Sequence, residues 1–414
     1  MENRKIVVVG GGPAGMMAAI RAGELSQDVT LIEKNPVLGK KLLLSGKGRC
    51  NLTNLCDIDL FLSRFSANAE FLRDAFKKFF NRELMHFFER NGLKLKVERQ
   101  QRVFPATDRS DSILEVLKKE LEKNRVKIVY KAQLKDILFK DSVVKGLLLS
   151  EGTVLSAEKI ILATGGISYK ITGSTGEVLK IAEGLGHSVI PLRPGLVPVE
   201  IKQDYPKRLE GLTLKNIRIK FSDGERQIIS EIGELLFTSF GISGPLVLTL
   251  SSKISDWVAR VKHIYAEIDL KPALSVEQLN ARFLREFHLN PRKSIKNILK
   301  EFLPLRLIDL FIEIAKIEPN KKVSQILKPE RERIIKLFKA FRMDVVKTAP
   351  LDVAMVTRGG ISLKDINPRT MESRRIKGLY FCGEMIDVDA DTGGFNLQAA
   401  FSTGYLAGES AALN

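Results

Sequence analysis

The feature that most constrains the fold of this chain is the junction of an apolar run with a cluster of glycines near its N-terminus. The run KIVVVG at residues 5–10 is β-branched and apolar, which predicts a buried parallel strand. It leads into GGGPAG, where Gly10, Gly12 and Gly15 form the pattern GxGxxG. Such a turn lets a helix N-terminus face a pyrophosphate, so the sequence predicts a phosphate-binding strand–turn–helix unit here.

The residues that follow supply the context that makes this pattern specific. The alanine-rich stretch 16–22 predicts a helix, and DVTLIE at 28–33 predicts a second strand that ends in an acid. In dinucleotide-binding folds, a carboxylate at this distance from the glycines accepts hydrogen bonds from a ribose. The complete βαβ unit therefore predicts a dinucleotide site, and the residues expected to contact the ligand are Gly10, Gly12, Pro13, Ala14, Gly15, Glu33 and Lys34.

FAD and NAD share this pattern, and two later segments favour FAD. The segment 379–408 resembles the C-terminal flavin segment of two-dinucleotide-binding flavoproteins, in which an aspartate reaches a ribityl hydroxyl and a helix N-terminus faces the flavin pyrimidine. KIILATGG at 159–166 resembles the strand that crosses the FAD pyrophosphate. These resemblances imply FAD contacts at Ala163, Thr164, Gly165, Gly166, Gly383, Glu384, Asp387, Gly394, Asn396, Leu397 and Gln398.

The stretch GKKLLLSGKGRCNLTN at 39–54 combines three glycines, four cations, one cysteine and two asparagines. Glycines let a backbone approach a ligand closely, and cations beside them suit a pyrophosphate. Because the stretch follows the second strand directly, we expect it to wrap the cofactor; the alternative is a solvated basic surface loop. The expected cofactor contacts are Lys41, Ser45, Gly46, Gly48 and Asn51, and the expected groups on the reaction side are Lys47, Arg49 and Cys50.

Seven pieces of the chain, in order, resemble the BaiN/RdsA family of NAD(P)/FAD-dependent oxidoreductases. They are GGGPAG, GKKLLLSGKGRCNLTN, RVFPATDRS, ATGGISYKITGSTGEVLKIAEGLGH, GELLFTSFGISGP, TRGGI and FCGEMIDVDADTGGFNLQAAFSTG. SGKGRCN and DTGGFNLQ are specific to that family rather than to flavoproteins in general. The resemblance implies an α/β fold in which a Rossmann-like FAD-binding domain of the glutathione-reductase type is interrupted by an inserted domain.

The predicted boundaries place the FAD-binding domain at 1–190 and 346–414 and the inserted substrate domain at 191–345. Within the insert, residues from about 195 to about 270 alternate apolar and polar side chains, as in TLKNIRIKFSD, which predicts a small β-barrel. Residues from about 275 to about 342 have apolar positions at helical spacing, as in RERIIKLFKAFRM, which predicts helices.

The charge balance indicates a polyanionic partner. The chain has 66 Lys+Arg against 49 Asp+Glu, a net charge of +17, and residues 191–340 hold 27 of the cations but only 18 of the acids. A lysine-rich genome would spread the excess evenly, whereas a binding surface for RNA concentrates it. The candidate RNA contacts in the insert are Lys207, Arg208, Lys215, Arg218, Lys220, Arg292, Lys293, Lys296 and Lys300.

Other features bear on location and on metals. The chain has no apolar run of about 18 residues, so no membrane span is predicted, and the N-terminal apolar run is too short for a secretory signal. With three cysteines and no such signal, we expect a cytoplasmic protein without a disulfide framework. The four scattered histidines show no metal-ligand spacing, so no metal site is predicted.

Activities attributed to members of the resembled family include reduction of a ribosomal-RNA uridine to dihydrouridine, oxidation of small amines and a steroid-like reduction. The basic insert favours the first, so the leading hypothesis is an enzyme that reduces a uridine of 23S ribosomal RNA. In this hypothesis reduced flavin delivers a hydride to C6 and an acid protonates C5. The family name implies NAD(P)H as the electron donor, although the chain has no second GxGxxG.

Cys50 is the predicted proton donor, because the cations of its loop would lower the pKa of its thiol. The alternative is a small buried packing cysteine. Two other functions remain open: an FAD-dependent oxidase or reductase of a small metabolite such as an amine or enone, and a flavin-bearing RNA-binding factor without turnover. Salt-sensitive RNA binding would exclude the small-metabolite enzyme, and loss of product after Cys50→Ala with FAD retained would exclude the factor without turnover.

Overall fold

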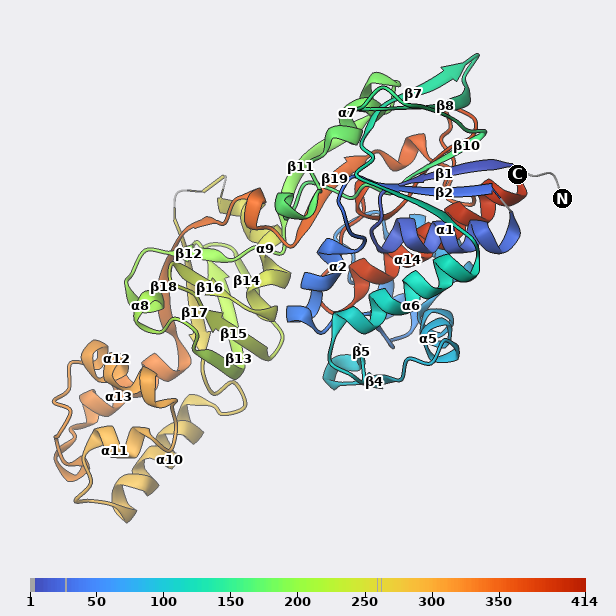
Figure 1. Ribbon diagram of the computed structural model, residues 1–414. Helices are drawn as coiled ribbons and strands as arrows, with labels where there is room; N and C mark the ends of the chain where they lie inside the picture. Colours follow the sequence, from blue (N-terminus) through green and yellow to red (C-terminus); the bar gives the residue numbers. More distant parts are fainter. Residues whose placement is uncertain (1–3, 27, 259, 262) are drawn as a thin grey trace. The chain divides into compact units, whose positions relative to one another are not determined.

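The computed structural model describes residues 4–26, 28–258, 260–261 and 263–414, and the chain forms two compact units (Figure 1). Unit 1 comprises residues 1–195 and 351–414, and unit 2 comprises residues 196–350. The divisions fall close to 190/191 and 345/346, the boundaries expected from the sequence. Each unit has its own core of buried apolar side chains.

Unit 1 is built around a five-stranded parallel sheet with the strand order β20-β10-β1-β2-β6. Its central strand β1 is buried from Ile6 to Val9, which is why its sequence is continuously apolar rather than alternating. The sequence-predicted Rossmann-like arrangement is therefore confirmed. The strands are β1 (Lys5–Val9), β2 (Asp28–Glu33), β6 (Lys127–Tyr130), β10 (Lys159–Leu162) and β20 (Leu379–Phe381).

The helices α1 (Pro13–Leu25) and α14 (Phe395–Leu413) lie side by side against one face of this sheet (Figure 1). Two glycines of α14 make the close approach possible. A Cβ atom on Gly404 would lie 2.2 Å from the carbonyl oxygen of Ala14, and one on Gly408 would lie 2.3 Å from that of Ala18. The last helix of the chain thus packs directly on the first, which joins the two sequence segments of unit 1.

The remaining elements of unit 1 form two small antiparallel sheets, the strand pair β11–β19 and covering helices. The small sheets have the orders β3-β5-β4 and β7-β8-β9. Their elements and the helices are α2 (Lys40–Leu44), β3 (Thr53–Asn54), α3 (Ile58–Leu62), α4 (Arg73–Lys78), α5 (Asn81–Arg90), β4 (Leu95–Val97), β5 (Arg102–Pro105), α6 (Ser110–Lys123), β7 (Leu134–Lys140), β8 (Val143–Leu149), β9 (Val154–Ser156), α7 (Glu177–Gly184), β11 (Val189–Gly195) and β19 (Val356–Ile361).

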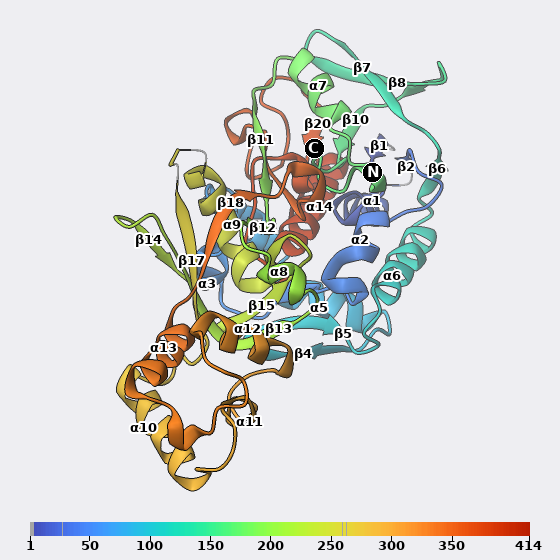
Figure 2. The same cartoon turned by 90° about the vertical axis from the view of Figure 1, so that its left-hand side faces the viewer.

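Unit 2 combines a closed six-stranded barrel with a group of helices (Figure 2). The barrel runs β13-β15-β16-β12-β18-β17 and closes because β17 also pairs with β13, while β14 extends β13 as a hairpin. The strands are β12 (Val199–Ile201), β13 (Thr213–Ser222), β14 (Gln227–Ile229), β15 (Gly233–Phe237), β16 (Gly241–Ser243), β17 (Ile264–Asp269) and β18 (Phe341–Thr348). The helices are α8 (Tyr205–Arg208), α9 (Pro245–Val258), α10 (Val276–Leu289), α11 (Ile295–Leu299), α12 (Leu305–Ala315) and α13 (Lys328–Lys339).

The predicted barrel is confirmed, but its expected limits are wrong at two places. The helix expected to include FRM at 341–343 ends at Lys339, and Phe341 begins β18. Phe341 and Met343 are buried on either side of exposed Arg342, which is the alternation of a strand. Within the expected barrel range, residues 245–258 form the helix α9 instead of a strand.

The sequence predicts no membrane-spanning segment, and the helices of the structure can be compared with this prediction. Among the residues that the structure describes, no helix combines the length and apolar character needed to cross a bilayer.

His187 follows α7 and is buried in unit 1, where it makes two hydrogen bonds. Its Nδ1 lies 3.1 Å from the carbonyl oxygen of Ala182 and must donate, so Nε2 accepts from the hydroxyl of Ser373 at 2.7 Å. Burial lowers the pKa of His187. Protonation then favours the unfolded chain, so the free energy of unfolding should fall as the pH drops below about 6.5, by at most about 1.4 kcal/mol per pH unit.

The measurement is urea unfolding between pH 5 and 8 for the native protein and His187→Gln. The variant should show a flatter pH dependence, because it cannot take up this proton. His86→Gln is the matched control, since His86 is exposed on α5, and it should keep the native profile. An unchanged profile in His187→Gln would contradict the prediction.

Candidate functional site

The glycines of the turn between β1 and α1 have two different roles. A Cβ atom on Gly10 would lie 2.6 Å from the carbonyl oxygen of Ala163, and one on Gly15 would lie 1.8 Å from that of Gly10. Those two glycines allow β1, α1 and the end of β10 to pack. Among the described residues, apart from Gly12 and its two chain neighbours, no atom lies within 4 Å of the Cβ position of Gly12, and Gly12 is the N-cap of α1. The middle glycine therefore keeps space open in front of the helix N-terminus, which suits a pyrophosphate.

Glu33 ends β2 beside this turn and is almost completely buried. Its Oε2 accepts from the backbone N–H of Gly11 at 2.7 Å, and its Oε1 accepts from the backbone and side-chain N–H groups of Asn35 at 2.8 and 2.7 Å. These bonds fix the carboxylate at the strand end, and Oε2, which accepts one of the three bonds, keeps a further lone pair for a ribose hydroxyl. The neighbouring Lys34 donates to Thr175 at 2.8 Å.

Four side chains from separate segments meet in one hydrogen-bonded cluster. Lys41 on α2 donates to Ser168 at 2.6 Å and to Glu384 at 2.5 Å. Glu384 also accepts from Ser168 Oγ and from the backbone N–H of Thr357, both at 2.8 Å. The hydroxyl of Thr357 accepts from the backbone N–H groups of Ile167 and Ser168. The cluster ties the expected cofactor segments 39–54 and 379–408, and the loop just after 159–166, to β19.

The N-terminus of α14 begins at Gly394, which has a φ of 99° and whose Cβ would lie 2.4 Å from the backbone of Thr53. No side chain of the described residues caps this helix, so the N–H groups of its first turn remain available. The side chains of Asn396 and Gln398 make hydrogen bonds within the protein. Asn396 holds the preceding loop through the backbone of Ala390, at 2.9 and 2.8 Å.

Gln398 is fully buried, and its amide is used within the protein. Its Oε1 accepts from Thr53 at 2.6 Å, and its Nε2 donates to Ser402 at 2.9 Å. The side chain therefore positions the helix N-terminus, and its amide is already used within the protein.

In the loop 45–51, Cys50 lacks the cationic environment that was expected from the sequence. Arg49 donates to Asp108 at 2.7 Å, pairs with Glu98 and lies over the ring of Phe104 at 4.3 Å, so its charge is already balanced. Cys50 is completely buried, and burial raises the pKa of its thiol to about 12, although a hydrogen bond with Ser45 opposes the rise. The expectation that loop cations lower this pKa is wrong, because the cations are exposed or paired elsewhere.

The remaining expected residues of this loop differ in exposure. Gly46, Lys47 and Gly48 are exposed, and all three have positive φ. Asn51 is the exception, since its Oδ1 is buried and has no hydrogen-bond partner among the described residues. A buried carbonyl oxygen without a donor is costly, so this atom indicates a ligand that supplies one.

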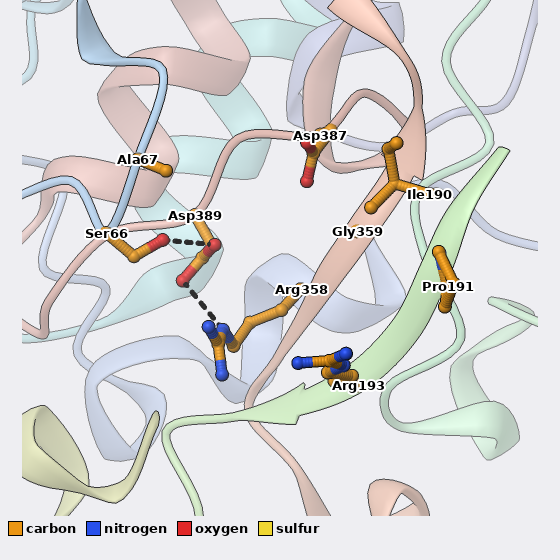
Figure 3. Close-up of a pocket in the computed structure, with 9 residues that line it drawn as sticks. All are labelled: Ser66, Ala67, Ile190, Pro191, Arg193, Arg358, Gly359, Asp387 and Asp389. Atoms are coloured by element: carbon orange, nitrogen blue, oxygen red, sulfur yellow. Dashed lines mark hydrogen bonds and ion pairs between the residues drawn. The ribbon is translucent and has the colours of Figure 1, made fainter. Parts of the chain in front are cut away.

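A cavity of about 200 Å³ opens beside the segment that follows Glu384 (Figure 3). Asp389 accepts from the hydroxyl of Ser66 at 2.6 Å and lies 3.8 Å from the guanidinium of Arg358. Asp387 accepts from Asn68 at 3.1 Å, and burial raises the pKa of its carboxyl. The cavity is lined by Ser66, Ala67, Ile190, Pro191, Arg193, Arg358, Gly359, Asp387 and Asp389.

A family model described as the HI0933-like protein Rossmann domain matches residues 4–410. The chain belongs to this family. Among curated HI0933-like relatives, the 3-dehydro-bile acid delta(4,6)-reductase of Clostridium scindens is 32% identical over 99% of both chains. The ribosomal RNA dihydrouridine synthase of Escherichia coli is 31% identical over 98% of this chain and 97% of that protein. The synthase of Haemophilus influenzae is 30% identical over 96% of each. The family resemblance found in the sequence is confirmed.

Solved structures share the fold of this HI0933-like chain at low sequence identity. The 3-ketosteroid-delta4-(5alpha)-dehydrogenase of Rhodococcus jostii RHA1 superposes with a TM-score of 0.53 at 17% identity, covering 99% of this chain and 97% of that one. The Escherichia coli quinol fumarate reductase subunit FrdA gives a TM-score of 0.54 at 18% identity, covering 99% and 70%. At this identity the likeness establishes the fold alone.

The residues of this HI0933-like chain fit FAD. Four features match the groups of FAD: the space before α1 suits a pyrophosphate, the remaining lone pair of Glu33 Oε2 suits a ribose, and the unpartnered Oδ1 of Asn51 and the open N-terminus of α14 suit the N–H and carbonyl groups of a flavin. FAD bound there would supply hydride chemistry. Family membership and these four features together support FAD as the cofactor.

Sequence reasoning missed several residues of the site. Ser168, Thr357, Arg193 and Arg358 were not predicted as site residues, although TRGGI was among the segments that resemble the family. The signal in that segment is its glycine pair. A Cβ atom on Gly359 would lie 2.5 Å from the carbonyl oxygen of Pro191, so the glycine lets β19 press against β11 at the cavity.

Proposed function

We propose that this protein is an FAD-dependent reductase that saturates the C5–C6 bond of a uridine in ribosomal RNA, in 23S RNA specifically. Two of its relatives carry the name ribosomal RNA dihydrouridine synthase, and a third is named a bile acid reductase. The two named chemistries are related, because each saturates a carbon–carbon double bond conjugated to a carbonyl group. The choice between an RNA and a small molecule therefore depends on features of this chain other than its flavin fold.

The distribution of positive charge within unit 2 is the observation that favours RNA over a small molecule as the substrate. Residues 271–339, which include α10 to α13, hold 16 Lys+Arg and 8 Asp+Glu. The other residues of unit 2, which include the barrel strands, hold 12 Lys+Arg and 11 Asp+Glu. Nearly all of the excess thus belongs to the helical part. A general lysine bias would charge both parts alike, whereas a surface for a nucleic-acid backbone would not.

Within the helical part, three exposed cations lie on two hydrogen-bonded segments, which we call the basic ribbon: Arg292, Lys293 and Lys322. The segments run antiparallel, with a bridge between Ser294 and Lys322 and a 3.0 Å bond from the N–H of Val323 to the carbonyl of Lys293. In the described part of the chain, none of the three cations has an acidic partner within 4 Å. Unbalanced cations side by side suit successive phosphates.

Not all of the cations expected to bind RNA are available in this way. Arg208 pairs with Glu313 at 2.7 Å, Lys220 with Glu267 at 2.5 Å and Lys296 with Asp309 at 2.6 Å. Lys207 and Arg208 lie on the short helix α8, before the barrel strand β13. The basic ribbon is therefore the better candidate for contact with the RNA backbone.

The proposed reaction adds two hydrogens to uracil. C6 receives a hydride and C5 a proton, while NAD(P)H, the proposed reductant, loses the hydride and becomes NAD(P)+. The protein must hold the base, exclude water and provide the proton.

The deciding experiment compares 23S ribosomal RNA from cells with and without this gene by nucleoside mass spectrometry. Loss of dihydrouridine in the deletion strain, restored by the gene, is the expected result. Unchanged dihydrouridine would overturn the proposal and leave a reductase or oxidase of a small metabolite. If RNA binds the purified protein but no dihydrouridine forms with reductant present, the protein is a flavin-bearing binding factor.

The basic ribbon makes a quantitative prediction. Arg292→Gln/Lys293→Gln/Lys322→Gln should weaken binding of 23S RNA fragments and reduce the slope of log affinity against log salt by about 2–3, because each lost phosphate contact removes about 0.7–0.9. Filter binding between 50 and 300 mM KCl measures both. The matched control is Lys220→Gln/Lys296→Gln/Lys328→Gln, which removes equal charge from lysines that have acidic partners. Equal effects of the two variants would contradict an RNA contact at the ribbon.

The role of Cys50 as proton donor stays a prediction, and its burial makes the test sharp. A thiol with a pKa of about 12 is protonated at neutral pH, as a general acid must be. If it protonates C5, Cys50→Ala should retain FAD and form product at least about 100-fold more slowly. Cys50→Ser, which keeps a donor, should be less impaired. Full activity in Cys50→Ala would leave Cys50 as a packing residue.

A further inference from the structure

The cavity of Figure 3 contains an arrangement that packing alone does not explain. Arg193 on β11 and Arg358 on β19 are direct partners in the antiparallel register. Like charges directly opposite each other on paired strands destabilise the pair. A register shift between Ile190 and Arg193 marks a bulge in β11 at this point, and bulges near active sites often redirect a side chain. Each guanidinium group has several N–H donors, so two of them opposite each other at a cavity suit a ligand that offers acceptor oxygens.

The remaining charges of the cavity restrict the class of ligand. The lining residues include two arginines and two aspartates, so the charges balance. A phosphate or carboxylate would be repelled by Asp387 and Asp389, which face the same space (Figure 3). The ligand that suits this lining is neutral and offers acceptors to the arginines and a donor to a carboxylate.

The size of the cavity restricts the ligand further. Its volume of about 200 Å³ lies below the range of roughly 300–1,000 Å³ typical of pockets for drug-sized molecules, and four of its nine lining residues are charged. A steroid ring system requires a larger and more apolar pocket. A single pyrimidine ring is small enough, and the imide edge of uracil presents a carbonyl, an N–H and a second carbonyl in a row.

We propose that this cavity recognises the imide edge of the substrate base, with Arg193 and Arg358 donating to the two carbonyl oxygens and Asp387 accepting from the N–H between them. Asp389, held by Ser66 and close to Arg358, positions that guanidinium. The inference rests on the proposed function and adds the means by which uracil is distinguished from cytosine. It assigns Asp387 to the base rather than to the ribityl chain of the cofactor.

The test uses the FAD-loaded protein and three nucleosides, uridine, 3-methyluridine and cytidine, with binding measured by saturation-transfer NMR. Uridine should bind at least about tenfold more tightly than either of the others, because methylation removes the donor and cytosine exchanges donor for acceptor. Equal binding of uridine and 3-methyluridine would overturn the inference.

Two variants assign the roles. Arg358→Gln should lower uridine affinity at least about tenfold, while Arg369→Gln, at an exposed arginine of unit 1 outside the cavity lining, should not. Asp387→Asn should lose the preference for uridine over cytidine, because an amide both donates and accepts. FAD content is measured from flavin absorbance in every variant. Loss of FAD from Asp387→Asn would assign that residue to the cofactor and overturn the inference; if Arg358→Gln does not fold, Arg193→Gln replaces it.

The outcomes separate this inference from the proposed function. If the gene is required for dihydrouridine but Arg358→Gln and Asp387→Asn bind and reduce RNA normally, recognition lies elsewhere and only the inference fails. If ribosomal RNA is unaffected and the FAD-loaded protein binds 4-androstene-3,17-dione in preference to uridine, both fail.

Discussion

Replacing Gly12 by alanine is expected to leave the FAD-free protein folded and to weaken FAD binding at least about tenfold. Apart from the chain neighbours of Gly12, no described residue has an atom within 4 Å of the position that the new Cβ would take, and the φ of −82° suits any residue. Alanine is a poorer N-cap than glycine, so the stability cost should stay below about 1 kcal/mol. The methyl group would, however, occupy the space before α1 where the pyrophosphate is expected, and a tenfold loss corresponds to about 1.4 kcal/mol of binding.

The matched variant is Gly15→Ala, three residues later in the same motif. Its Cβ would lie 1.8 Å from the carbonyl oxygen of Gly10, an overlap with backbone that no side-chain rotation can relieve. We expect the free energy of unfolding of the FAD-free protein to fall by more than about 3 kcal/mol, because β1 and α1 must move apart. Gly184→Ala, at the end of α7, is the control for substituting a helical glycine without a clash, because beyond its own helix backbone and chain neighbours no described atom lies within 4 Å of the new Cβ.

Urea unfolding of FAD-stripped protein and fluorescence titration with FAD provide the two readouts. We expect each variant to change a different readout: Gly12→Ala should weaken FAD binding, and Gly15→Ala should lower the free energy of unfolding. Equal destabilisation by the two variants would show that both glycines serve packing and that the pyrophosphate is not bound before α1.

The opening βαβ unit could be predicted from the sequence because its determinants are local. The apolar strands, the glycine turn and Glu33 lie within about 30 residues of one another, and each has a meaning that does not depend on the rest of the fold. The barrel of unit 2 is different. In the sequence, strand β18 is separated from its partner β12 by most of unit 2. Residues 341–348 form a strand because they pair with β12 on one side and with β17 on the other, which closes the barrel. Local propensity favoured helix at Phe341, and tertiary pairing decided otherwise.

The same contrast between local and distant determinants explains which features of the site could be predicted from the sequence. The expectation for Cys50 assumed that Arg49 beside it in the sequence would act on its thiol, but Arg49 is paired with Glu98 and Asp108 from a distant part of the chain. The partnership of Arg193 and Arg358 depends on the register of two strands that flank the whole of unit 2 in the sequence. Neither pairing has a signal in the nearby residues, whereas the glycine turns, which depend on their own backbone conformation, could be recognised directly.

The cluster of Lys41, Ser168, Thr357 and Glu384 leads to the second large prediction, because it joins the part of unit 1 before the insert to the part after it. The side chains of Lys41 and Glu384 are 24% and 20% exposed, so solvent screens their 2.5 Å ion pair only in part. Glu384→Ala would leave Lys41 without its carboxylate and the N–H of Thr357 without an acceptor. We expect a loss of about 3 kcal/mol in the free energy of unfolding, together with weaker FAD binding.

A double-mutant cycle isolates the ion pair from the rest of the cluster. Glu384→Gln keeps an acceptor for Thr357 and Ser168 but removes the charge, and Lys41→Met keeps the length of the side chain. The double variant should be less destabilised than the sum of the single variants, with a coupling energy of about 1–2 kcal/mol. The matched control is the pair of Lys170 and Asp352, which also joins the two segments at 2.8 Å but is more than half exposed. Its coupling should stay below about 1 kcal/mol. Similar coupling energies for the two pairs would mean that Glu384 is held by solvent-screened contacts like any surface acid, and the cluster would then not be what joins the two sequence segments of unit 1.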